Sequence, residues 1–114
     1  MTTKILIPLD SRPSHLDIGN TSDYRDYDVT GLHQVCIQCA NNSGVAWGTG
    51  RVGVVFTNIG ELWGNLPDGA ITPYSTEKIQ QAVGLNGLVR RMRVYTSTAN
   101  ASAANIQLCV IGIS

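Results

Sequence analysis

Residues Asn105–Ile113 read NIQLCVIGI, and this run indicates the fold class. Its side chains alternate with the two-residue period of a β-strand. One face carries Ile106, Leu108 and Val110, while the opposite face still carries the apolar Ile111. Because a strand with apolar side chains on both faces must be covered on both sides, we expect this one at the centre of a sheet or in an interface.

Other segments repeat the strand pattern around this run. The residue types and alternation favour strands over 4–9, 32–40, 51–58 and 88–97, with Pro8 restricting the first to an edge. A weaker strand over 61–66 would close a hairpin with 51–58, and 77–83 fits either a short helix or a strand. Gly53 inside its strand indicates a bulge or a close backbone approach. About seven short strands separated by turns predict an all-β protein, an antiparallel β-sandwich of jelly-roll or immunoglobulin-like type.

The first 28 residues differ from the rest of the chain. They are rich in Asp and turn-forming residues and have few apolar anchors, which predicts either an extended N-terminal arm or a long loop over 1–28, followed by the sandwich over 29–114. An arm would place Ile5, Leu6, Ile7 and Leu9 in position to add a strand to another chain's sheet. These four residues are the predicted partner-binding set.

Charge is sparse and balanced, with eight basic and eight acidic side chains, and charged residues are 14% of the chain. Only Arg90, Arg91 and Arg93 cluster, too few to neutralise a row of phosphates, so we expect no nucleic-acid partner. No apolar run reaches the roughly 18 residues of a membrane helix, so we expect no membrane partner. Near-zero net charge permits self-association. The odd number of cysteines argues against a disulfide framework and for synthesis in a reducing cytoplasm.

Three patterns could carry chemistry, and each has a simpler structural interpretation. Cys36 and Cys39 have the C-x-x-C spacing, but in a strand they point to opposite faces, and no second ligand pair follows. The acidic run 23–28 could hold calcium, yet Arg25 offsets it and the EF-hand pattern is absent. No nucleophile elbow or phosphate-binding loop occurs, so we expect no enzyme and no cofactor.

Trp47 is the most conspicuous aromatic, because it lies in the turn-rich segment 44–50 and not in a predicted strand. An exposed aromatic ring can stack on a sugar, so Trp47 is a candidate ligand-stacking residue. Trp63, Tyr74 and Tyr95 could complete a sugar-stacking platform with it. The simpler interpretation is that the aromatic residues are spread through the core, with their polar tips reaching partners.

A resemblance covers residues 28–114. It rests on the order of four segments: DVTGLHQVCIQC (28–39), RVGVVFTNIGELW (51–63), VGLNGLVRRMRV (83–94) and ANASAANIQLCVIG (99–112). This order resembles the small β-sandwich structural proteins of bacteriophage virions, including capsid decoration (cement) proteins and tail-associated domains. The resemblance implies a homo-oligomer, such as a trimer, bound to the particle surface, and no catalytic residues.

The sequence therefore predicts a non-enzymatic virion structural protein, made in the host cytoplasm, that stabilises a capsid by binding itself and the major capsid or other virion proteins. The alternative is a carbohydrate- or receptor-binding β-sandwich module, with a glycan as partner. A small hydrolase using Glu61 or a histidine is a third class, for which the sequence offers no constellation.

Overall fold

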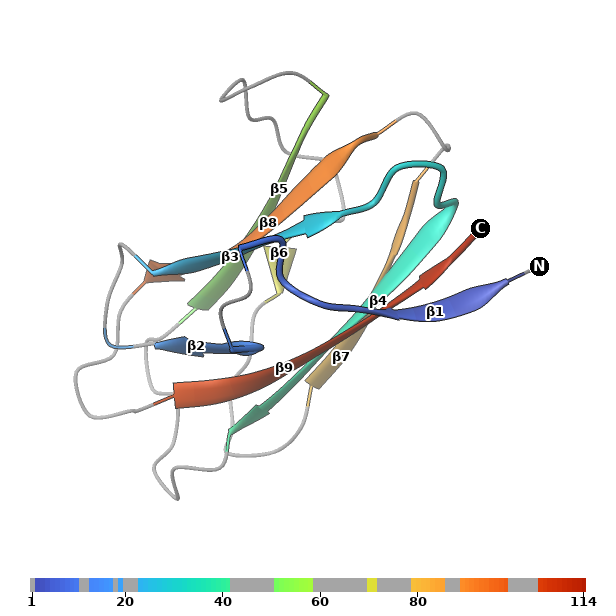
Figure 1. Cartoon of the computed structure of the whole chain (residues 1–114). Coiled ribbons are helices and arrows are strands. Elements are labelled where there is room, and N and C mark those ends of the chain that lie inside the picture. Colours follow the sequence, from blue (N-terminus) through green and yellow to red (C-terminus); the bar gives the residue numbers. More distant parts are fainter. Residues whose placement is uncertain are drawn as a thin grey trace.

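The computed structural model describes residues 2–10, 13–17, 19, 23–41, 51–58, 70–71, 79–85, 89–98 and 105–114. In these residues the regular structure is β-strand, arranged as two antiparallel sheets (Figure 1). The strands are β1 (Thr3–Leu6), β2 (His15–Asp17), β3 (Tyr24–Asp28), β4 (Gln34–Asn41), β5 (Arg51–Thr57), β6 (Ala70–Ile71), β7 (Ile79–Gly84), β8 (Arg91–Thr98) and β9 (Asn105–Ile113). The predicted antiparallel β-sandwich is confirmed. Within the described ranges no helix is long and apolar enough to cross a membrane.

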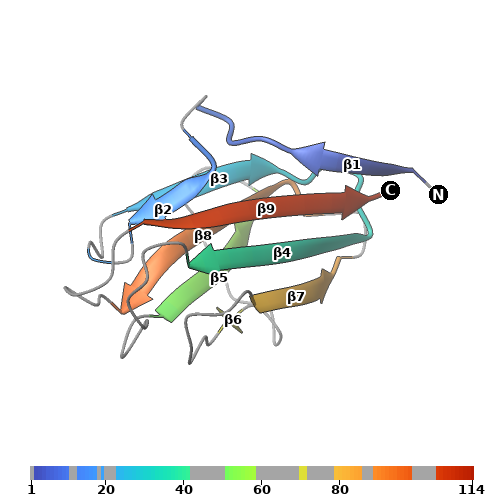
Figure 2. The ribbon, with the colours of Figure 1, turned by 90° about the horizontal axis from the view of Figure 1, so that it is seen from below.

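The larger sheet has the order β1-β9-β4-β7, and β2 also pairs with β9 (Figure 2). β1 lies beside the end of β9, with Leu6 opposite Val110, while β2 lies beside its beginning, with Leu16 opposite Ile106. β9 therefore has partners along both edges, as its two apolar faces predicted.

The smaller sheet has the order β3-β8-β5-β6. In it Tyr27 of β3 lies opposite Met92 of β8, and Val94 of β8 lies opposite Val54 of β5. Strands β4, β5, β8 and β9 each direct alternate side chains inward, and most of these are apolar, so the inward sets of the two sheets form one core. The core members are Leu6, Leu16, Tyr27, Val29, Leu32, Val35, Ile37, Cys39, Val52, Val54, Phe56, Leu85, Met92, Val94, Ile106, Leu108 and Val110.

The N-terminal segment is integrated into the sandwich, which differs from the arm or long loop predicted over 1–28. β1 and β2 pair with β9 of the same chain, and β3 pairs with β8. Between β1 and β2 the backbone crosses to the smaller sheet, where the Leu9 amide donates to the Asp26 carbonyl at 2.8 Å. Leu6, Leu16 and Tyr27 are buried anchors of this segment, and Leu16 and Tyr27 each stand between two polar neighbours. Because isolated anchors give no period-2 signal, the sequence pattern did not reveal β2 and β3.

Two ambiguous segments are resolved by the pairing. The helix-or-strand segment 77–83 contains β7, which pairs with β4 from Ile79 to Gly84. Gly53 lies opposite Tyr95, whose ring leans over the glycine at the place a Cβ would occupy. The close approach expected at Gly53 is therefore present, and the register irregularity lies just before it, between Arg51 and Val52. The predicted strand 61–66 lies outside the described residues.

Gly112 is expected to tolerate no side chain. A Cβ at this buried position of β9 would overlap the Cδ1 atom of Leu32, which is itself only 2% exposed and has little room to move. We expect Gly112→Ala to lower the free energy of unfolding by about 1–3 kcal/mol, the usual cost of overpacking a core. Urea unfolding of this variant checks the value. Gly84→Ala is the matched control, because nothing lies within 4 Å of a Cβ there, and an equal loss in both variants would contradict the packing argument.

Candidate functional site

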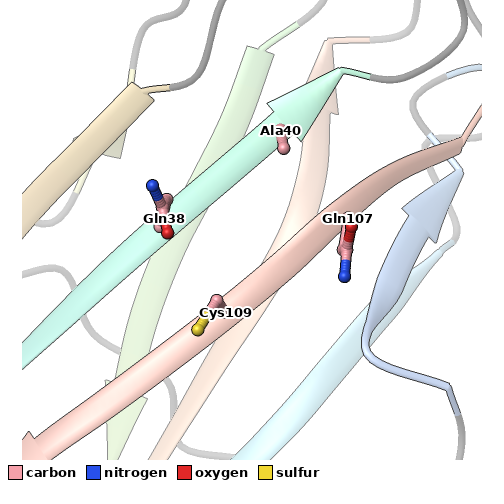
Figure 3. A pocket seen from close by; sticks show the side chains of 4 residues that line it. All are labelled: Gln38, Ala40, Gln107 and Cys109. Atoms are coloured by element: carbon pink, nitrogen blue, oxygen red, sulfur yellow. The ribbon is translucent and has the colours of Figure 1, made fainter.

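A hollow of about 260 Å³ lies on the outer face of the larger sheet. It is lined by Gln38 and Ala40 of β4 and by Gln107 and Cys109 of β9, as Figure 3 shows. These side chains point outward because their neighbours along each strand are core residues: Ile37 and Cys39 on β4, and Ile106, Leu108 and Val110 on β9. The strand alternation thus presents all four lining residues to the solvent.

The register of the two strands gives the hollow its shape. Gln38 lies opposite Cys109, and Ala40 lies opposite Gln107. Directly opposed side chains have Cβ atoms about 4.5–5.5 Å apart, and diagonal neighbours are about 7–8 Å apart. The two long glutamines therefore occupy one diagonal, and the short alanine and cysteine occupy the other. Because the Ala40 and Cys109 side chains are short, the hollow opens above them, and the amides of Gln38 and Gln107 border it on two sides.

The four residues that line the hollow are uncharged, and the nearest acidic or basic side chains described on this face are His15, opposite Gln107, and Asp17 on β2. The described outward side chains of β4 and β9 are Gln34, Cys36, Gln38, Ala40, Gln107, Cys109, Ile111 and Ile113. Each glutamine amide offers two donor hydrogens and an acceptor oxygen. Groups of this kind suit a neutral ligand with several hydroxyls better than an ion. The volume lies just below the range of about 300–1,000 Å³ typical of drug-sized ligands, so the hollow fits a small group.

The C-x-x-C pair is divided between the two faces, as the strand geometry predicted. Cys36 lies on the outer face with the hollow and is partly exposed, whereas Cys39 is fully buried in the core. Burial raises the pKa of the Cys39 thiol to about 12, so it stays protonated and inert at neutral pH. All three cysteines are free.

The outer face of the smaller sheet is a second polar surface, and its side chains bind one another. Arg93 makes a two-pronged ion pair with Asp26, with Nε–Oδ1 at 2.8 Å and Nη2–Oδ2 at 3.0 Å. Its guanidinium also lies 4.0 Å from the centre of the Tyr24 ring. Together with Tyr95 over Gly53, these contacts hold the surface of the sheet together and pair the charges of Arg93 and Asp26.

The three carboxylates of the acidic run 23–28 each interact with a different residue. Asp23 binds Arg25 at 2.7 Å, Asp26 binds Arg93, and hydrogen bonds from Thr30 hold the pKa of Asp28 below its usual value. Among the described residues no three His, Cys, Asp or Glu side chains come together as a possible metal site.

The four predicted partner-binding residues differ in burial, and their role in binding stays a prediction. Leu6 is 7% exposed and belongs to the core, because it faces Val110 across β1 and β9. Ile5, Ile7 and Leu9 are exposed. Trp47, the candidate ligand-stacking residue, lies outside the described residues, as does Glu61.

Sequence reasoning missed the hollow. Its residues on β4 and β9 are 67 to 71 positions apart in the chain, and only the pairing of the two strands brings them together. A signal was present in each strand. The outward Gln34, Cys36 and Gln38 alternate with the apolar Val35 and Ile37, and Gln107 stands between Ile106 and Leu108. That signal identifies an outward face but cannot say which strands are neighbours.

Known structures share this fold, although no protein-family model and no curated protein sequence matches the chain. The K2 cleaved adhesin domain of Lys-gingipain aligns with a TM-score of 0.59 and 17% identity over 81% of this chain and 63% of that one. The CBM36-1 domain of a xylanase from the hindgut metagenome of Trinervitermes trinervoides aligns with a TM-score of 0.56 and 15% identity over 99% and 98%. A carbohydrate-binding module, CBM36, solved with calcium and xylotriose, gives 0.54 and 13% over 97% and 98%.

These similarities show that the fold is the β-sandwich of carbohydrate-binding modules and adhesin domains. The resemblance to bacteriophage virion proteins is confirmed only as far as the β-sandwich itself. A place in a virion, a capsid partner and a trimer stay predictions of the sequence.

Proposed function

We propose that the chain is a non-enzymatic carbohydrate-binding module whose hollow between β4 and β9 holds a ring of a neutral glycan. The observation that carries the proposal is the pair of amides, Gln38 and Gln107, on opposite sides of a small uncharged hollow. A sugar presents adjacent hydroxyls, each both donor and acceptor, and an amide is complementary to such a pair. The shared fold of carbohydrate-binding modules supports the same class of function. No observation favours capsid decoration over it.

The hydrogen bonds set the expected strength of binding. Each neutral hydrogen bond contributes about 0.5–1.5 kcal/mol net, so the loss of the two that one amide makes weakens binding about tenfold. The short Ala40 and Cys109 side chains form the open diagonal of the hollow. Filling that diagonal excludes the ligand without altering the amides.

The test measures binding of soluble β-linked trisaccharides of xylose and of glucose by calorimetry. We expect at least one to bind, with about tenfold weaker affinity in Gln38→Ala and Gln107→Ala and no measurable binding in Ala40→Leu. Gln34→Ala is the matched control, because Gln34 lies on the same face of β4 but does not line the hollow. Unchanged affinity in the three hollow variants, or equal loss in the control, would contradict the proposed site.

Thiol alkylation gives an independent readout in the unmodified protein. Cys109 lines the hollow, and Cys36 lies on the same face outside it. A bound sugar is expected to slow alkylation of Cys109 and leave that of Cys36 unchanged, as followed by mass spectrometry. Equal protection of both thiols would indicate a general change of the sheet instead of occupancy of the hollow.

A further inference from the structure

The outer face of the larger sheet is apolar on one side of the hollow. Ile111 of β9 lies opposite Ile5 of β1 and opposite Cys36 of β4, so the three side chains form one row across three neighbouring strands (Figure 2). Ile113 is the next outward residue of β9 beyond this row. We call Ile5, Cys36, Ile111 and Ile113 the apolar patch.

The side chains of the apolar patch point away from the core. Ile5 precedes the buried Leu6 and is 74% exposed, which makes it one of the three large hydrophobic side chains that are exposed in the described part of the chain. Cys36, Ile111 and Ile113 are partly exposed. A reduced cysteine on such a surface acts as a small hydrophobic group. Adjacent apolar side chains that stay in contact with water mark a binding surface.

The apolar patch adjoins the hollow. Cys109 lies two residues from Ile111 along β9, Gln38 lies two residues from Cys36 along β4, and both Cys109 and Gln38 line the hollow. A strand rises about 3.3–3.4 Å per residue, so the patch begins about 7 Å from these lining residues. A molecule bound in the hollow can therefore extend onto the patch along the surface of the sheet.

The opposite side of the hollow is polar. Gln107 lies opposite His15 of β2, and His15 points outward because the next residue, Leu16, is buried. Asp17 lies on the same side of β2 as His15. The hollow thus separates a polar side, at β2, from an apolar side, at β1. A ligand that matches both sides carries hydroxyl groups at one end and hydrocarbon at the other.

We propose that the ligand of the hollow is a glycan that carries an alkyl chain, with a sugar ring in the hollow and the chain on the apolar patch. The inference rests on the proposed function, because it needs a sugar in the hollow. The patch consists of aliphatic side chains and a thiol, which an alkyl chain can cover closely. A flat aromatic group would gain most from an aromatic partner, and the patch has none.

The test is a titration of the full chain with the methyl, butyl and hexyl β-glycosides of xylose and of glucose, followed by calorimetry. A methylene on a surface is covered on one side, so each one is expected to tighten binding about twofold, and the hexyl glycoside should bind about thirtyfold more tightly than the methyl glycoside. Hexanol lacks the hydrogen bonds to the amides and should bind about tenfold more weakly than the hexyl glycoside. The phenyl glycoside, with the same number of carbon atoms, should also bind less tightly than the hexyl glycoside.

Threonine substitutions remove hydrocarbon from the patch and keep the β-branched shape that suits a strand. The hexyl-to-methyl affinity ratio is expected to fall to about tenfold in Ile111→Thr and to about threefold in Ile5→Thr/Ile111→Thr. Val55→Thr is the matched control, because Val55 is partly exposed on β5 of the smaller sheet, away from the hollow. Its ratio should stay as in the wild type, and circular dichroism should show all variants folded.

Alkylation of Cys36 gives a second readout in the unmodified protein. Cys36 belongs to the patch and Cys109 to the hollow. The methyl glycoside is therefore expected to slow the alkylation of Cys109 alone, whereas the hexyl glycoside should slow that of both thiols. Equal reactivity of Cys36 with the two glycosides would contradict the place proposed for the chain.

The failure of this inference differs from the failure of the proposed function. If the glycosides bind but the hexyl-to-methyl ratio is near one, or falls equally in Val55→Thr, the alkyl chain is refuted and the sugar site stands. Hexanol or phenyl glycoside binding as tightly as the hexyl glycoside would also refute it. So would sedimentation equilibrium that shows a dimer of the wild type and a monomer of Ile5→Thr/Ile111→Thr, because the patch would then join two copies. If no glycoside and no trisaccharide binds, the proposed function fails as well.

Discussion

Replacing Arg25 with methionine is expected to lower the free energy of unfolding by about 3–5 kcal/mol, the usual result of removing one partner of a buried ion pair. The Arg25 side chain is only 7% exposed. Its Nε donates to the Pro13 carbonyl at 2.8 Å, and its Nη1 donates to Asp23 Oδ1 at 2.7 Å and to the Tyr24 carbonyl at 2.6 Å. Methionine fills similar volume and leaves all three acceptors without this donor.

Urea unfolding of Arg25→Met, Asp23→Asn and the double variant measures the coupling between the two side chains. Arg90→Met is the matched control, because Arg90 is exposed and the same substitution there should change stability far less. A loss in Arg25→Met no larger than in Arg90→Met would contradict the structural role of the buried guanidinium.

The same network predicts a pH dependence. Burial of Asp23 raises its pKa, but hydrogen bonds from the Asp17 amide and Arg25 outweigh this, and the net pKa lies below its ordinary value of 3.8. A depressed carboxyl pKa contributes stability above the unfolded pKa and loses it as the pH falls through the folded pKa. The difference between wild type and Asp23→Asn should therefore be full at neutral pH and shrink below about pH 4.

Replacing Tyr27 with alanine is expected to cost about 3–5 kcal/mol, as for other aromatic residues removed from a core. Tyr27 is fully buried on β3, and its hydroxyl lies 3.2 Å from Ser14 Oγ. Ser14 donates its only hydroxyl hydrogen to the Leu108 carbonyl at 2.9 Å, so the tyrosine is the donor to Ser14. The side chain thus joins β3, the start of β2 and β9.

Tyr27→Phe separates the two parts of this effect. It keeps the ring and removes the hydroxyl, so the expected loss is about 0.5–1.5 kcal/mol. Tyr24→Ala is the matched control on the outer face of the same strand, where the ring is half-buried and the loss should be smaller than in Tyr27→Ala. Urea midpoints of the three variants check the order, and a Tyr24→Ala loss equal to that of Tyr27→Ala would contradict the assignment of Tyr27 to the core.

Arg25 and Tyr27 connect the N-terminal segment to the sandwich. This connection is the feature that the sequence pattern predicted least well. Arg25 and Tyr27, two residues apart, both point to the inward side of β3. A charged residue at an inward position is uncommon, because its burial is costly unless it is paired. Pattern reasoning therefore treated the stretch as a polar arm or loop, whereas the acceptors that satisfy Arg25 come from residues 13, 23 and 24.

By itself the sequence determined the class of fold and the orientation of most strands. Alternation in β4, β5, β8 and β9 was sufficient because each strand has two or more inward apolar residues, and a one-residue slip would expose them all. It also predicted a central or interface position for β9, which the structure resolves as central, and opposite faces for Cys36 and Cys39.

Only the tertiary structure decided which outward side chains meet. The hollow needs β4 beside β9, and the burial of Leu6 needs β1 beside β9. Both pairings join segments that are far apart in the chain. Side-chain alternation is a local property of the backbone, but neighbour choice depends on the total burial gained when distant segments pair. For this reason the sequence does not show that Gln38 and Gln107 are neighbours. Nor does it show that Leu6 is buried in the core while Ile5 and Ile7 are exposed.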